Sequence, residues 1–237
     1  MALALPQLPT AAAVSVIVAG MDLAPLIDHT CLRPEAVGAD IDRLCDEALE
    51  HGFFSVCVAP VWVARAVERL DRAAVRVGTV AGFPHGNSLT VVKGVAAESA
   101  LAAGADEIDM VMSLGAFTEG AHDTAAADIA LVADMVHGKR GALVKVIVET
   151  ALLEGDEIEL ACGLAERAGA DFVKTSTGFA SSGATVAAVR RMRAAVGERL
   201  GVKAAGGIRD ADTARALVEA GASRIGCSAS VAIVTGV

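Results

Sequence analysis

Five charged residues of this 237-residue sequence stand in the middle of apolar runs: Asp28, Asp109, Lys145, Lys174 and Lys203. Burying a lone lysine among β-branched neighbours is costly unless the amine is paired or neutral. If the runs are strands of a parallel barrel, neither of their faces is solvated. We therefore expect these side chains to point into a shared lumen. A purely structural ion network is the alternative reading.

Two of these lysines have the spacing for amine chemistry. Lys174 and Lys203 fall at similar depth on consecutive predicted strands, and neighbouring strands lie about 4.8 Å apart. Mutual repulsion and burial both lower the pKa of a lysine, and a neutral lysine attacks carbonyl carbons. We expect the second lysine to stay protonated, with the Asp109 carboxylate holding that cation and passing protons through water.

Small residues follow the last three predicted strands, in the segments 175–178, 205–209 and 226–228. Glycine lets backbone N–H groups approach an anion, and helices that begin just after such loops add their positive ends. Phosphate sites of (β/α)₈ barrels commonly use these loops, although the glycines could simply make tight turns. The candidate phosphate-binding residues are Thr177, Gly178, Gly206, Gly207, Arg209, Gly226 and Ser228.

The elements that must position these residues alternate regularly between strand and helix. Runs rich in Val, Ile and Phe predict strands at 25–30, 53–58, 75–81, 107–112, 143–149, 172–176, 202–205 and 224–227. Stretches with helical periodicity lie between them, at 40–50, 91–103, 123–136, 157–168, 184–196 and 212–220.

Eight such units in about 240 residues predict an α/β fold of the (β/α)₈ type, a TIM barrel with a parallel sheet. A doubly wound open sheet is the alternative, but no GxGxxG follows the first strand. We expect one barrel domain over 22–237, preceded by a short arm at 1–21. The arm lacks a basic n-region and is interrupted by Pro6 and Pro9, so it resembles neither a secretory signal nor a membrane span.

The composition narrows the functional classes. The formal net charge is −9 and no basic run occurs, so we expect no nucleic-acid partner. Five scattered cysteines without CxxC spacing predict reduced thiols and a cytoplasmic protein. We also expect no membrane partner, and no metal site, since metal-binding spacings such as HxH are absent.

Eight motifs together identify a family resemblance. The chain resembles the deoxyribose-phosphate aldolases, class I aldolases that fold as (β/α)₈ barrels, from about residue 22 onward. The pair FVKTSTG and VKAAGGIR is specific, and either motif alone would be weaker. The matching motifs are IDHT at 27–30, SVCVAP at 55–60, GFPHG at 82–86, EIDMV at 107–111, LVKVIVET at 143–150, FVKTSTGF at 172–179, VKAAGGIR at 202–209 and RIGCS at 224–228.

The resemblance implies reversible cleavage of 2-deoxy-D-ribose 5-phosphate to D-glyceraldehyde 3-phosphate and acetaldehyde, without cofactor or metal. It implies that Lys174 forms the Schiff base, that Lys203 lowers the pKa of Lys174 and joins the proton relay, and that Asp109 is the acid/base carboxylate. The expected partners are the sugar phosphate and acetaldehyde, together with further copies of the chain in a dimer or tetramer. The resemblance also implies that Asp28 and Lys145 belong to the surrounding polar network and that Thr30 lies near it, and we expect all three among the substrate-binding residues.

The chain departs from the family pattern at its end. Some members carry a tyrosine-bearing tail that assists proton transfer, whereas this sequence contains no Tyr and ends at Val237. We expect water to replace that tail, or the step to be slower. Ala229 stands where some members have a second Ser, which could weaken phosphate binding. We expect Cys57 to be a core residue, with a position facing the site as the alternative, and we leave open whether Glu149 pairs with Lys145.

Two other functions remain open at this point. One is a Schiff-base barrel enzyme that acts on another phosphorylated aldehyde or ketone. The other is a catalytically inactive barrel that binds sugar phosphates.

Overall fold

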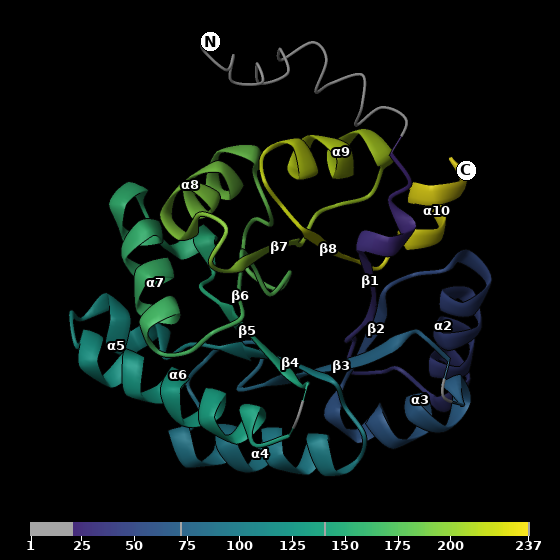
Figure 1. Cartoon of the computed structure of the whole chain (residues 1–237), viewed down its shortest axis with the longest axis horizontal. Coiled ribbons are helices and arrows are strands. Elements are labelled where there is room, and N and C mark those ends of the chain that lie inside the picture. The colour runs from purple at the N-terminus through teal and green to yellow at the C-terminus, as the bar shows by residue number, and fades with distance from the viewer. Residues whose placement is uncertain (1–20, 72, 140, 237) are drawn as a thin grey trace, which may run out of the picture.

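Eight parallel strands close into a barrel in which each strand pairs with its neighbours in chain order and β8 pairs with β1 (Figure 1). The computed structural model describes residues 21–71, 73–139 and 141–236, so the predicted arm lies outside the described residues except for Met21. The strands are β1 (Ile27–Cys31), β2 (Ser55–Val58), β3 (Arg76–Ala81), β4 (Glu107–Val111), β5 (Leu143–Ile147), β6 (Phe172–Lys174), β7 (Gly201–Ala205) and β8 (Arg224–Cys227).

Helices surround the barrel on its outside (Figure 1). The α-helices are α2 (Gly38–His51), α3 (Val63–Leu70), α4 (Thr90–Ala102), α5 (Leu114–Thr118), α6 (His122–His137), α7 (Gly155–Arg167), α8 (Val186–Val196), α9 (Ala211–Glu219) and α10 (Ser230–Thr235). Three short 3₁₀ helices, η1 (Ala24–Leu26), η2 (Pro60–Trp62) and η3 (Thr150–Leu152), lie before β1, after β2 and after β5.

The predicted (β/α)₈ fold is therefore confirmed, with all eight strands near their predicted places. The predicted helical stretches omit α3, α5 and α10, which have 8, 5 and 6 residues. A segment of one or two turns repeats its apolar positions too few times for a helical period to stand out in the sequence. The predicted strands at 143–149 and 172–176 were too long, since β5 ends at Ile147 and β6 at Lys174.

Alternation along the strands separates an apolar exterior from a charged interior. In β4, Ile108 and Met110 belong to the buried apolar core between barrel and helices. Glu107 and Asp109 alternate with them and are also fully buried, so they occupy the opposite, lumenal face. The same alternation places Lys145 of β5 in the lumen. The apolar layer thus holds the barrel together, while the lumen carries the polar groups.

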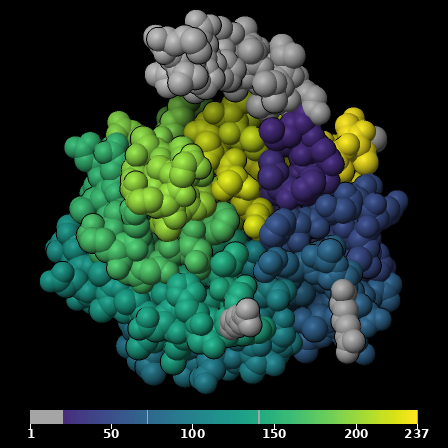
Figure 2. All heavy atoms as spheres, viewed as in Figure 1, coloured from purple at the N-terminus to yellow at the C-terminus, as the bar shows by residue number. Residues whose placement is uncertain are grey.

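The first and last described segments lie side by side, as the purple and yellow regions of Figure 2 show. The reason is the closure of the barrel, in which Ile27, Asp28 and His29 of β1 pair with residues 225–227 of β8. Within the described residues, no helix has both the length and the apolar character that a membrane crossing requires.

A buried ion pair between α4 and α6 sits outside the lumen. Lys93 Nζ lies 2.6 Å from Asp128 Oδ2, and both side chains are almost completely buried. The same amine donates to the carbonyl oxygen of Val111 at the end of β4 (2.9 Å). Thr90 donates to the other oxygen of Asp128 at 2.9 Å. This cluster ties two helices to the strand that carries Asp109.

Removing one partner of this pair should be more harmful than removing both. Asp128→Ala leaves a buried ammonium without its carboxylate, and we expect a loss of about 3–5 kcal/mol in the free energy of unfolding. The double variant Lys93→Met/Asp128→Leu removes both charges and should lose less. Urea unfolding at neutral pH measures both values. A single variant as stable as the wild type would contradict this account.

Candidate active site

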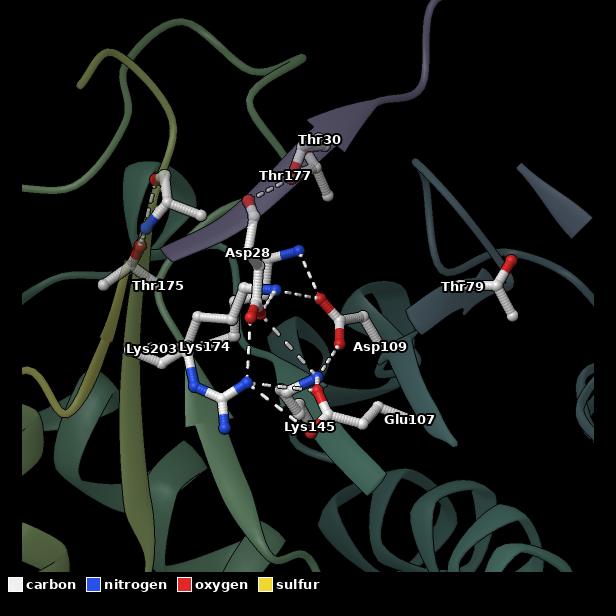
Figure 3. Close-up of polar contacts among 12 residues, drawn as sticks. Asp28, Thr30, Thr79, Glu107, Asp109, Lys145, Lys174, Thr175, Thr177 and Lys203 are labelled. Carbon is white, nitrogen blue, oxygen red and sulfur yellow. Dashed lines mark hydrogen bonds and ion pairs between the residues drawn. The ribbon is translucent and has the colours of Figure 1, made fainter. Parts of the chain in front are cut away.

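Seven charged side chains from six strands meet in the lumen, all of them buried. Figure 3 shows Asp28, Glu107, Asp109 and the three lysines pointing toward one another. The five charged residues singled out in the sequence are thus brought together. Two further members, Glu107 of β4 and Arg224 of β8, join them.

Asp109 is the centre of the cluster because all three lysines donate to it. Lys145 Nζ lies 2.8 Å from Asp109 Oδ1, while the amines of Lys174 and Lys203 each lie 2.8 Å from Oδ2. The strand register produces this geometry, since Asp109 is the Cα partner of Lys145, and Lys174 is the Cα partner of Lys203. The predicted similar depth of Lys174 and Lys203 is confirmed.

A second layer of carboxylates and a guanidinium supports the outer lysines. Asp28 Oδ2 lies 2.5 Å from Lys203 Nζ, and Glu107 Oε2 lies 2.6 Å from Lys145 Nζ. Arg224 Nη1 contacts both carboxylates, at 2.8 Å from Asp28 Oδ1 and 3.2 Å from Glu107 Oε2. Lys174 receives no support from this layer.

Counting charges shows which amine can give up its proton at least cost. Three carboxylates face four basic groups, so the cluster is neutral when one basic group is uncharged. A guanidinium stays protonated in proteins. Lys203 has two carboxylates within 2.8 Å and Lys145 has two within 2.8 Å, whereas Lys174 contacts Asp109 alone. Lys174 is therefore the group that a neutral cluster leaves uncharged.

The pKa values of the two adjacent lysines move in opposite directions. Burial lowers the pKa of Lys174; Asp109 opposes the shift, and the neighbouring Lys203 cation adds to it. Lys203 is buried as well, but Asp109 and Asp28 together raise its pKa above the ordinary lysine value. Burial opposes ionisation of Asp109, but its three lysines hold the pKa of that carboxyl well below its usual range. These are the directions that amine chemistry at Lys174 requires.

A pocket of about 480 Å³ opens above the cluster. Of the seven charged residues in the cluster, Lys174 is the one that lines it, so the amine whose pKa is lowered lies at its floor. Asp109, Lys203, Asp28 and Lys145 do not line the pocket. Asp109 contacts Lys174 directly, and the other three are connected to Lys174 through Asp109. Among the described residues, His, Cys, Asp and Glu side chains form no group of three or more that could hold a metal ion.

Loops after β1, β6, β7 and β8 form the remaining walls together with the end of β8, and the lining includes every predicted phosphate-binding residue. Gly206 and Gly207 have φ angles of 88° and 77°, a conformation that disfavours any residue with a Cβ. The loops after β6 and β7 also approach each other closely. A Cβ on Gly183 would lie 2.0 Å from the carbonyl oxygen of Gly206, so there is no room for a side chain at that position. Where these two loops meet, the pocket wall is therefore formed by glycine backbone.

The expectation that helices begin directly after these loops is only partly right. The helix after the β6 loop, α8, begins at Val186, well beyond Gly178. The N-terminus of α9 is capped by Asp210, whose carboxylate accepts from the N–H of Thr213 at 2.7 Å. The expectation does hold for α9 and α10, which begin at Ala211 and Ser230, directly after the β7 and β8 loops, although α10 has only 6 residues.

Glu149 pairs with Thr177 rather than with Lys145. Its Oε2 accepts from the Thr177 hydroxyl at 2.5 Å and from the Thr177 N–H at 3.1 Å. Lys145 is instead held by Glu107 and Asp109. Thr177 lines the pocket, but its two donors are used in shaping the β6 loop, which weakens its assignment as a substrate ligand.

Two other predicted residues have a structural role beside any contact with substrate. A Cβ on Gly226 would lie 2.9 Å from Lys203 Cε, so the missing side chain makes room for that lysine. Thr30 lines the pocket while its hydroxyl donates to the carbonyl oxygen of Asp28 at 2.9 Å.

Cys57 faces the charged lumen, contrary to its expected place in the apolar core. It is buried, and the charges of Asp109 and the three lysines act on it. Burial raises the pKa of this thiol to about 11, so Cys57 remains a neutral thiol beside the cluster. Alternation along β2 could have predicted this lumenal position. Cys57 is two residues beyond Ser55 and so shares its face of the strand, and the Ser55 hydroxyl donates to Asp28 at 2.7 Å.

Comparison with known proteins agrees with the geometry of this site. The sequence model of the DeoC/LacD family of aldolases matches residues 23–235. The chain is 53% identical over 219 residues to the deoxyribose-phosphate aldolase of Thermococcus gammatolerans, an alignment that covers 92% of this chain and 97% of that protein. Identity to the Enterococcus faecalis deoxyribose-phosphate aldolase is 52% over 216 residues, covering 91% and 97%.

A solved structure shows the same likeness. The deoxyribose phosphate aldolase of Aeropyrum pernix, described as a unique tetramer, superposes with a TM-score of 0.88 at 33% sequence identity. The match covers 96% of this chain and 98% of that one.

Proposed function

Since the chain belongs to the DeoC/LacD family of aldolases, we propose that it cleaves 2-deoxy-D-ribose 5-phosphate reversibly to D-glyceraldehyde 3-phosphate and acetaldehyde. One observation carries the proposal. The amine of Lys174 is the basic group of the cluster with a single carboxylate partner, and it is also the one that reaches the pocket. A buried, uncharged amine at the floor of a pocket is suited to form an imine with an aldehyde.

The first step joins the substrate to the enzyme. Neutral Lys174 attacks C1 of the open-chain sugar, and one proton taken up from solvent allows the carbonyl oxygen to leave as water. The product is a protonated imine, so this step places one new positive charge next to Asp109. That carboxylate lies 2.8 Å from the amine in the free enzyme, so the charge that develops there has an ionised partner already in place.

The second step breaks the bond between C2 and C3. The electron pair of that bond moves toward the imine while the C3 hydroxyl loses its proton, which releases D-glyceraldehyde 3-phosphate and leaves an enamine. We assign the proton transfer to Asp109 with Lys203 and a water molecule. Because the lysines keep the pKa of Asp109 low, its carboxylate holds the proton only transiently. Protonation of the enamine and hydrolysis of the imine then release acetaldehyde and restore Lys174.

The glycine loops supply the phosphate end of the pocket. Gly178, Gly206, Gly207 and Ser228 line it next to Arg209, and their conformations leave peptide N–H groups free to face an anion. The substrate would thus lie with its phosphate at the β6–β8 loops and its aldehyde at Lys174.

Reductive trapping tests this assignment. Incubation with 2-deoxy-D-ribose 5-phosphate and borohydride should attach the reduced adduct to Lys174, as peptide mass spectrometry can locate. Unphosphorylated 2-deoxyribose should label the protein more slowly, because it makes no use of the glycine loops. Lys174→Ala should abolish the label, and Lys139→Ala, which changes a lysine outside the pocket, should retain it. No adduct on the wild-type protein under turnover conditions would rule out the proposed imine.

We also propose that the chain forms a homo-oligomer through the exposed faces of α4 and α6. Val91, Val92 and Val95 of α4 are 52–59% exposed, and Leu131 and Met135 of α6 adjoin them across Gly94. Apolar patches of this kind commonly mark association surfaces. Sedimentation analysis should find a dimer or tetramer, and Val95→Glu should shift it toward the monomer. A monomeric wild-type protein would contradict this.

We propose a cytoplasmic location, which the state of the thiols supports. All five cysteines are free and buried, as expected where disulfides do not form. Cell fractionation in the source organism tests this, and recovery in a secreted fraction would contradict it.

A further inference from the structure

Arg224 closes the bottom of the charged cluster. It begins β8, and its guanidinium carbon lies 3.4 Å from the ring centroid of Phe54 and 5.5 Å from that of Phe172. The side chain is 5% exposed and does not line the pocket. No substrate bound above Lys174 could touch it.

Two chains of ion pairs nevertheless connect Arg224 with the carboxylate that holds Lys174. One runs through Asp28 and Lys203 to Asp109 Oδ2, with links of 2.8, 2.5 and 2.8 Å. The other runs through Glu107 and Lys145 to Asp109 Oδ1, with links of 3.2, 2.6 and 2.8 Å. Glu107 therefore occupies the same place in the second series of ion pairs as Asp28 occupies in the first.

The groups that face this cluster come from all eight strands. On β3, Gly78 and Val80 share the lumenal face and carry no titratable side chain, and Arg76 at the start of that strand is half-buried with its guanidinium 5.7 Å from the Phe54 centroid. The remaining titratable groups are Asp28 of β1, Cys57 of β2, Glu107 and Asp109 of β4, Lys145 of β5, Lys174 of β6, Lys203 of β7 and Arg224 of β8. Cys57 is a neutral thiol, so three carboxylates balance Lys145, Lys203 and Arg224.

We propose that Arg224 and Glu107 are positioning residues for the imine reaction, because their opposite charges set the balance that leaves Lys174 as the unprotonated amine. Without Arg224, three carboxylates would face two fixed cations, and the cluster would become neutral by keeping a proton on Lys174. Without the Glu107 carboxylate, the cluster would already carry one excess positive charge, and a proton on Lys174 would be disfavoured further. This inference rests on the proposed function, since it concerns the same amine.

The pH dependence of trapping on Lys174 measures this balance. The initial rate of borohydride-dependent labelling with acetaldehyde is followed across pH, with the adduct located by mass spectrometry. Labelling of the wild type should rise through the pKa of Lys174. For Arg224→Met the added negative potential raises that pKa, so the midpoint should move to higher pH by about one unit. For Glu107→Gln, which keeps the shape of the side chain, the midpoint should move to lower pH.

Two control variants separate charge from packing. Arg224→Lys keeps the positive charge and should leave the midpoint close to that of the wild type. The double variant Arg224→Met/Glu107→Gln removes one charge of each sign and should restore it. A residue needed only for packing would lower the rate of labelling without moving midpoints in opposite directions.

The outcomes are distinguishable from a failure of the proposed function. If wild-type Lys174 takes no label at any pH, the imine proposal itself is wrong. If it is labelled and both single variants keep the wild-type midpoint, the role of Arg224 and Glu107 is refuted. Circular dichroism establishes that each variant is folded. Should Arg224→Met fail to fold, the direction of the Glu107→Gln shift decides alone.

Discussion

The chemistry of this barrel depends on one carboxylate shared by three lysines. Asp109 accepts from Lys145, Lys174 and Lys203 at 2.8 Å each, in a lumen from which the surrounding strands exclude bulk water. Desolvation penalises every charge there, so a charge persists only where opposite charges lie close by. Asp28 and Glu107 supply that support to Lys203 and Lys145. Lys174 lacks it and lines the pocket, so the same electrostatics that hold the cluster together lower the pKa of the amine for which we propose the nucleophilic role.

The fold makes such a costly arrangement stable by separating two layers. Apolar residues on the outer faces of the strands pack against the helices in one continuous core, while the alternate residues carry the charges inward. Barrel closure brings Asp28 of β1 next to β8, where Arg224 binds it at 2.8 Å. Residues from both ends of the chain thereby enter a single cluster. Of the charged cluster, only Lys174 lines the pocket next to the glycine loops. The charges of the cluster are therefore paired with one another and not with these loops.

Much of this could be predicted from the sequence, and the omissions have physical reasons. Periodicity identified the strands, and isolated charges in apolar runs identified Asp109 and the three lysines, because such residues are rare unless they act together. The sequence analysis did not single out Glu107 and Arg224, because a charge at the edge of an apolar run is usually solvated. Each lies two residues before a candidate site residue, Asp109 and Gly226 respectively, and this spacing could have placed both on the lumenal face. The pairing of Glu149 with Thr177 depends on how two loops meet, and no local pattern encodes that contact.

The protonation state of Lys174 in the free enzyme tests the central claim most directly. Proteins labelled with ¹³C at the lysine Cε allow each amine to be titrated by NMR, with Lys174→Met to assign the signal. An ordinary lysine titrates near pH 10.4. The electrostatics described above predict that Lys174 titrates well below that value, and that Lys203→Leu moves its midpoint upward. A Lys174 signal that titrates as an ordinary lysine in the wild type, unchanged by Lys203→Leu, would contradict the account.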